Sequence, residues 1–194
     1  MKRLNDLTRK EFSQLYPILL EAHHSDWGMI YQNERSLIRD CIGEHPIARI
    51  NHIGSTSVPG LIAKPTIDIL LEIMGESQPE DWLAALEAAG YSVLVEPENP
   101  PPHLLLLKGY GATGFSGQAF HLHIRYFGDW NELYFRDYLV AHSDVAEAYG
   151  NLKVSLMQTY QFDRDAYNQG KTAFIRPVPE QARQEMGGRY RIFK

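Results

Sequence analysis

The chain has 194 residues with 44% hydrophobic and 22% charged side chains, which is the balance of a globular protein with its own core. Its formal net charge of −5 argues against a broad nucleic-acid-binding face, because such a face needs an excess of lysine and arginine, and it leaves room for a local basic pocket. The single cysteine, Cys41, excludes an internal disulfide and predicts a location in the reducing cytoplasm. No apolar run approaches the roughly 20 residues that cross a bilayer, so no membrane partner is expected.

Hydrophobic spacing divides the chain into helices, then strands, then helices again. Thr8 followed by Glu11 has the pattern of a capping box, which predicts the start of a first helix, although Pro17 lies inside its apolar run. In chain order we expect helices over 11–23 and 29–42, strands over 47–53 and 66–73, a helix over 79–89, strands over 91–96, 103–108 and 119–127 with a glycine-rich turn at 109–117 between the last two, and helices over 130–142, 144–160 and 163–184.

This order predicts an α+β fold, because the strands are clustered and the helices are segregated to the two ends. We expect a single domain over residues 1–194, with a mixed, largely antiparallel sheet of about five strands. Its N-terminal helices and sheet would occupy residues 1–128, a helical part 129–186 and a tail 187–194.

The residues with the most chemical use lie where the first two strands meet. Gly54, Ser55, Thr56 and Ser57 form a small, hydroxyl-rich loop, and Asp68 follows on the next strand. Backbone N–H groups of such a loop can approach phosphate oxygens closely, and the hydroxyl groups add donors. An aspartate on the neighbouring strand can bind a divalent ion that neutralises phosphate charge. The stretch therefore predicts a site for a nucleotide or another phosphate-bearing small molecule.

The sequence from Gly54 to Leu61, with Lys64-Pro65-Thr66-Ile67-Asp68-Ile69, resembles the GrpB family, also called UPF0157. The resemblance continues through His121-Leu122-His123, residues 133–139 and the Tyr-x-x-x-Lys pairs at 149–153 and 167–171, and it covers roughly residues 22–182. It implies the nucleotidyltransferase superfamily with a polymerase-β-like palm, and relatives fused to dephospho-CoA kinase. A triphosphate and a divalent metal, Mg²⁺ or Mn²⁺, are the ligands it implies.

One position departs from the superfamily pattern of Asp-x-Asp or Asp-x-Glu. Two carboxylates at i and i+2 stand roughly 6.6 Å apart on one strand face, close enough to hold one or two ions. Here the position two residues after Asp68 is Leu70, and Glu72 lies roughly 13 Å along the strand from Asp68. The second carboxylate is therefore missing or replaced.

His121 and His123 are the candidate replacements, since they share one face of their strand. If that strand lies beside the strand of Asp68, all three side chains could bind one metal and act in catalysis. Imidazole ligands would favour Zn²⁺ or Mn²⁺ over Mg²⁺. The alternative is that both histidines are ordinary strand residues bonded to their neighbours.

Basic side chains follow on the predicted helices. Arg136, Lys153 and Lys171 each stand near an aromatic residue in the sequence, and Lys64 precedes the second strand. A phosphate-bearing ligand needs such cations. The alternative is solvated lysines whose aliphatic stems pack on tyrosine rings.

Three functions remain open from the sequence. The leading hypothesis is a nucleotidyltransferase-like enzyme that binds a nucleoside triphosphate and a divalent metal at the Gly-Ser loop and Asp68. The second is a non-catalytic nucleotide- or anion-binding module that has lost two-metal chemistry, as Leu70 suggests. The third is a metal-dependent hydrolase or phosphate-transfer enzyme that uses Asp68, His121 and His123.

Overall fold

The computed structural model describes residues 4–75, 79–94 and 102–191. These residues fall into two compact units. The first lies within residues 1–6, 25–52 and 66–128 and contains the sheet, and the second lies within 7–24, 53–65 and 129–194 and is mainly helical. Residues 95 and 96 of the predicted strand 91–96 and the last three residues of the predicted tail lie outside the described part.

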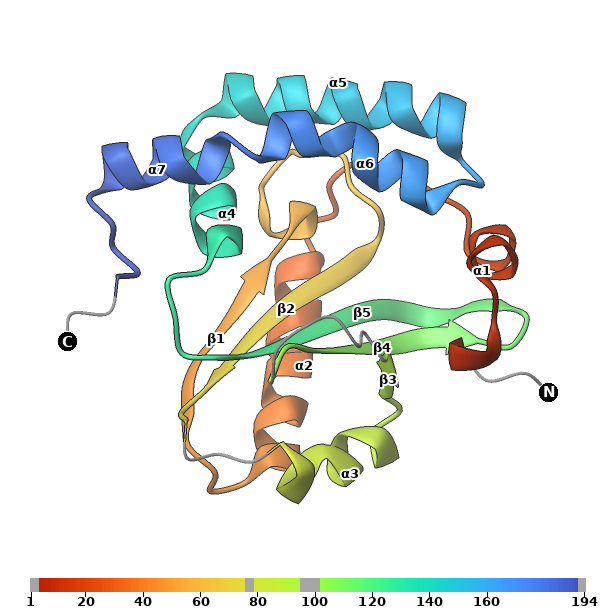
Figure 1. Cartoon of the computed structure of the whole chain (residues 1–194), viewed down its shortest axis with the longest axis vertical. Helices are drawn as coiled ribbons and strands as arrows, with labels where there is room; N and C mark the ends of the chain where they lie inside the picture. Colours follow the sequence, from red (N-terminus) through yellow and green to blue (C-terminus); the bar gives the residue numbers. More distant parts are fainter. Residues whose placement is uncertain (1–3, 76–78, 95–101, 192–194) are drawn as a thin grey trace. The chain divides into compact units, whose positions relative to one another are not determined.

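The first unit is built on a five-stranded sheet with the order β1-β2-β5-β4-β3 (Figure 1). β2 pairs with β5 in parallel, whereas the pairs β5–β4 and β4–β3 are antiparallel, so the predicted mixed, largely antiparallel α+β sheet is confirmed. The helices of this unit are α2 and α3; α2 contacts both α3 and β2. The bounds are η1 Leu4–Asp6, α2 Trp27–Ile42, β1 Ile47–Ile53, β2 Thr66–Ile73, α3 Glu80–Ala88, β3 Ser92–Leu94, β4 Leu104–Gly111 and β5 Gly114–Tyr126.

The two faces of this sheet have different side-chain chemistry. Lys108 of β4 and Phe120 of β5 are register partners, and the Lys108 ammonium group binds Glu34 of α2 at 2.8 Å, so their face is turned toward α2. Side chains alternate along a strand. Asp68, His121 and His123 therefore lie on the opposite face, as the register of β2 with β5 requires.

The hairpin of β4 and β5 is longer than predicted, and the turn placed at 109–117 is wrong. β4 continues to Gly111 and β5 begins at Gly114, and the pairing shifts register between Lys108 and Tyr110. Gly109 has φ +84°, and a Cβ atom there would lie 2.3 Å from the carbonyl oxygen of Gln118. Only glycine fits this bulge. The glycine-rich segment predicts a turn in the sequence because glycines are typical of both turns and bulges.

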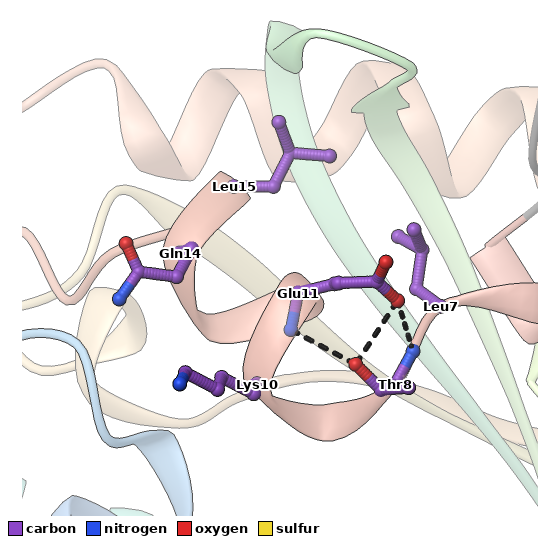
Figure 2. A pocket seen from close by; sticks show the side chains of 6 residues that line it. All are labelled: Leu7, Thr8, Lys10, Glu11, Gln14 and Leu15. Atoms are coloured by element: carbon purple, nitrogen blue, oxygen red, sulfur yellow. Dashed lines mark hydrogen bonds between the residues drawn. The ribbon is translucent and has the colours of Figure 1, made fainter.

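The second unit contains the helices α1 and α4–α7, among which α4 contacts α5 and α7, and α6 contacts α5 and α7. The predicted Thr8–Glu11 capping box is present (Figure 2), but the helix ends at Leu15 because Pro17 cannot continue it. Pro177 and Pro179 likewise divide the predicted helix 163–184 in two. The bounds are α1 Arg9–Leu15, η2 Ser55–Ser57, α4 Asn131–Ala141, α5 Ser143–Tyr160, α6 Arg164–Ile175 and α7 Val178–Met186.

Among the described residues, no helix combines the length and the apolarity that crossing a bilayer requires.

A buried ion pair joins β1 to β2 inside the first unit. Arg49 donates from Nε and Nη2 to the two carboxylate oxygens of Glu72, at 2.8 and 2.6 Å, and the backbone N–H of Gly128 donates to the same carboxylate at 3.1 Å. Glu72 is fully buried. These three hydrogen bonds and the positive charge of Arg49 compensate the buried negative charge of Glu72. Glu72 therefore stabilises the sheet only when Arg49 is present.

We expect Arg49→Met to lower the free energy of unfolding by about 3–5 kcal/mol, because it leaves a buried carboxylate without its counter-charge. The double variant Arg49→Met/Glu72→Met should recover most of that loss. Urea unfolding measures both. Arg9→Met serves as the control, since Arg9 pairs with Asp165 on the exposed surface and should change stability far less. Equal losses in the single and double variants would contradict this account.

Candidate functional site

The structure brings Asp68, His121 and His123 together on one face of the sheet. The parallel register places Asp68 opposite His121 and Leu70 opposite His123, which confirms the expected adjacency of the two strands. Asp68 Oδ1 lies 2.9 Å from His121 Nδ1 and 4.0 Å from His123 Nε2. One ligand atom from each residue lies within 4.8 Å of the other two. Because two ligands of one ion bound at about 2.1 Å are at most about 4.2 Å apart, a small side-chain rotation would close the set around a metal.

The charge of Asp68 suits a cation. Burial raises the pKa of its carboxyl group, but the hydrogen bond to the His121 imidazole and the neighbouring His123 imidazole outweigh burial and hold that pKa well below the ordinary value of an aspartate. The carboxylate is therefore ionised at neutral pH. All three side chains are partly exposed, with 27%, 16% and 25% of their surface accessible, so an ion or ligand can reach them.

The two strand positions after Asp68 on the same face offer no further ligand. Leu70 is fully buried, and the Glu72 carboxylate is bound by Arg49 and the Gly128 amide. His123 is the register partner of Leu70, so its imidazole is presented beside the position where the superfamily pattern has its second carboxylate. The arrangement can therefore supply one carboxylate and two imidazoles, a set suited to Zn²⁺, Mn²⁺ or Fe²⁺.

Sequence reasoning missed Tyr110. Its Oη atom lies 2.6 Å from Nε2 of His121, on the side of the ring away from Asp68. Regular alternation along β4 would place Tyr110 on the same face as Lys108, which is the opposite face from His121. The bulge at Gly109 reverses this. A glycine inside a strand-like run is the signal that could have indicated it.

The Gly-Ser loop belongs to the second unit, and it is a tight 3-10 turn. Gly54 has φ +71°, and the hydroxyl of Ser57 donates to its carbonyl at 2.6 Å. The amides of Ser57 and Val58 donate to Gly54 and Ser55 within the turn, so these two N–H groups are not available to an anion. Thr56 is buried, whereas Ser55 and Ser57 are half-buried.

Lys153 of α5 holds this loop. Its ammonium group donates to Ser55 Oγ at 3.0 Å and to the carbonyl of Ile62, and it lies 4.8 Å from the centre of the Tyr149 ring. The side chain is 2% exposed. These contacts explain a lysine at this position without any ligand, and its predicted contact with phosphate stays a prediction.

The other predicted cations also lie in the second unit. Arg136 of α4 donates to Asp137 at 2.8 Å and to the hydroxyl of Tyr190 at 2.9 Å. Lys171 of α6 is half-buried, with its ammonium group 4.6 Å from the centre of the Tyr167 ring. Lys64 is half-buried beside the loop end. Arg136 and Lys171 thus have structural contacts, and their predicted contact with phosphate stays a prediction.

An open depression of about 570 Å³ runs along α1 (Figure 2). It contains none of the predicted site residues. The Thr8–Glu11 capping box occupies part of its wall, so its polar groups are bonded to one another. The lining residues are Leu7, Thr8, Lys10, Glu11, Gln14 and Leu15.

The sequence comparisons agree on one family. A family model described as GrpB protein matches residues 17–181. A UPF0157 protein of Streptomyces coelicolor is 32% identical over 187 residues, which are 93% of this chain and 94% of that protein. A UPF0157 protein of Pseudomonas aeruginosa is 37% identical over 150 residues, which are 77% of this chain but only 61% of that relative's length.

Solved structures extend the comparison to the fold. The crystal structure of a conserved GrpB protein from Enterococcus faecalis has a TM-score of 0.76 at 28% identity, over 87% of this chain and 99% of that one. A GLD-2/RNP-8 complex has a TM-score of 0.51 at 12% identity, over 87% of this chain and 68% of that one. A poly(A) polymerase complex of GLD-2 and GLD-3 matches at a TM-score of 0.47 and 12% identity, over 72% of this chain and 46% of that one. At such identity the GLD-2/RNP-8 likeness concerns the fold alone.

We expect Lys153→Met to lower the free energy of unfolding by about 1–3 kcal/mol, because the variant fills the same space but leaves the acceptors on Ser55 and Ile62 without their donor. Lys171→Met is the matched control: it also removes a lysine from beside a tyrosine ring, but from a half-buried position, and should cost less. Chemical denaturation with either urea or guanidinium provides the comparison. A Lys153→Met variant as stable as Lys171→Met would show that the ammonium contacts do not hold the loop.

Proposed function

Because the chain belongs to the GrpB family and brings Asp68, His121 and His123 together, we propose that it is a nucleotidyltransferase-like protein that binds a nucleoside triphosphate with a divalent metal. The cluster of these three side chains is the observation on which the proposal rests. The family and fold comparisons support the superfamily but not an activity, because one fold can host many chemistries.

The three side chains fit a transition-metal ion better than Mg²⁺. Mg²⁺ prefers oxygen ligands in an octahedral arrangement and keeps several waters, whereas two imidazoles and a carboxylate suit Zn²⁺ or Mn²⁺. A bound ion would neutralise phosphate charge and orient the attacking group. The ionised Asp68 carboxylate supplies the only negative charge among the three ligands.

The reaction of this class is the transfer of a nucleotidyl group. An acceptor oxygen attacks the α-phosphorus of the triphosphate, a new P–O bond forms, the bond to the β-phosphate oxygen breaks, and pyrophosphate leaves. The acceptor's proton passes to solvent, because Asp68, His121 and His123 are the proposed metal ligands. The phosphate contacts that the sequence predicts, the Gly54–Ser57 loop and the cations Lys64, Arg136, Lys153 and Lys171, all belong to the second unit.

One observation favours a second candidate, a non-catalytic nucleotide- or anion-binding module. Leu70 is fully buried, and Glu72 is committed to Arg49, so the two-carboxylate arrangement of two-metal catalysis is not available on β2. The two candidates differ in turnover. Release of pyrophosphate that depends on Asp68 supports the enzyme, whereas binding of a triphosphate without any product supports the module. Hydrolysis of a phosphate ester without nucleotidyl transfer would instead support the third hypothesis.

We expect metal-stripped protein, purified without a histidine tag, to bind one equivalent of Zn²⁺ or Mn²⁺. Asp68→Asn should weaken that binding by more than the roughly 10- to 100-fold that the loss of an outer-shell partner costs, because it removes the charged ligand. Isothermal titration with chelator competition gives the affinities. Asp40→Asn is the control, since it removes the same charge from an exposed position on α2. Unchanged affinity in Asp68→Asn would refute the metal site.

We further expect the metal-loaded protein to bind nucleoside triphosphates, and Ser55→Ala to weaken this binding without changing metal affinity. Titration with each of the four ribonucleoside triphosphates in the presence of Mn²⁺ tests this expectation. Asp68→Asn tests the metal dependence of the same binding. If wild-type protein binds metal but no triphosphate, the metal site stands and the nucleotidyltransferase proposal falls.

A further inference from the structure

His121 has a hydrogen-bonding partner on each of its ring nitrogens. Asp68 Oδ1 lies 2.9 Å from Nδ1, and Tyr110 Oη lies 2.6 Å from Nε2. We propose that Tyr110 is the positioning residue of the metal site. Its hydroxyl group holds the ring of His121 and accepts a hydrogen bond from Nε2–H when Nδ1 binds a metal. The inference rests on the proposed metal site and adds to it a residue outside the ligand set.

The chemistry of the hydroxyl group explains why a tyrosine suits this position. Asp68 is a carboxylate and only accepts hydrogen bonds, so in the metal-free protein a neutral His121 carries its proton on Nδ1, and its bare Nε2 accepts from Tyr110. A metal on Nδ1 requires the opposite tautomer, in which Nε2 carries the proton and donates it. A hydroxyl group can donate in the first state and accept in the second, whereas a carboxylate could only accept.

Metal-bound histidines almost always donate their second ring N–H to a nearby acceptor, which fixes the ring and raises the basicity of the ligating nitrogen. The Tyr110 hydroxyl occupies that position for His121. The two rings are also nearly parallel, with an interplanar angle of 21° and 5.8 Å between centroids. Phe115 lies on Tyr110 with 5.3 Å between ring centroids, so the phenol ring is itself held in place.

The backbone is built to place Tyr110 there. A β-bulge re-aims the side chain that follows it. Gly109 has φ +84°, and its missing Cβ atom makes room for the backbone of Gln118 and Ala119. Without this bulge, alternation would turn Tyr110 toward the face of Lys108 and Glu34. The bulge therefore places the Tyr110 hydroxyl beside His121, on the face opposite Lys108.

The test compares wild type with Tyr110→Phe, which keeps the ring and removes the hydroxyl. We expect affinity for Zn²⁺ and Mn²⁺ to fall roughly 10- to 100-fold, as loss of an outer-shell partner does. Tyr91→Phe is the matched control, because it removes a hydroxyl bonded to Glu34 in the same unit and should leave metal affinity within about twofold. Thermal unfolding of the metal-free variants checks that both remain folded.

A second measurement needs no metal affinity. Nitrogen-15 NMR of the His121 ring should show the Nδ1–H form in metal-free wild type and the Nε2–H form after addition of Zn²⁺, and Tyr110→Phe should shift the resonance of Nε2 in both states. Equal metal affinity and unchanged ring resonances in Tyr110→Phe would overturn the inference while leaving the metal site intact. Failure of wild type to bind Zn²⁺ or Mn²⁺ would overturn both.

Discussion

The parallel pairing of β2 with β5 is the constraint on which the candidate site depends. It places Asp68 opposite His121 and Leu70 opposite His123, so residues more than fifty positions apart in the sequence share one sheet face. A shift of one residue would turn one strand's set to the other face. The apolar partners prevent this slip, because Ile67, Ile69 and Leu71 are fully buried on the other face of β2. Core packing therefore fixes the geometry of the polar cluster.

Much of this frame could be predicted from the sequence. The bounds of β1 and β2 match the predicted strands, because β1 is rich in isoleucine, β2 is an apolar run, and Gly54 and Pro65 mark clear breaks. The adjacency of Asp68 and the two histidines was a conditional expectation, since a sequence shows which residues share a strand face but not which strands are neighbours. Tyr110 could not be predicted by alternation, because the bulge at Gly109 inverts the pattern.

The role of Lys153 shows a different limit of sequence reasoning. A lysine four residues after a tyrosine on a helix reads equally as a ligand contact or as a side chain packed on a ring. In the structure its ammonium group is buried against Ser55 and Ile62 and also lies near the Tyr149 ring. The structure therefore shows the packing on the ring, and the contact with a ligand stays a prediction. From sequence alone, the burial of a side chain is inferred from the periodicity of apolar residues. This inference fails for a long charged side chain that is buried, such as that of Lys153.

In the proposed metal site, the absence of a second carboxylate would have an electrostatic consequence that favours phosphate. A divalent ion held by Asp68 and two neutral imidazoles keeps a formal charge of about +1, whereas two carboxylates would reduce it to about zero. That remaining charge would attract an anionic ligand more strongly, in a partly buried setting where screening is weak. Leu70 and the Arg49-bound Glu72 keep further negative charge away from the ion. In the proposed one-metal site, Leu70 and the Arg49-bound Glu72 would therefore increase the affinity for phosphate while they make a two-carboxylate arrangement impossible on β2.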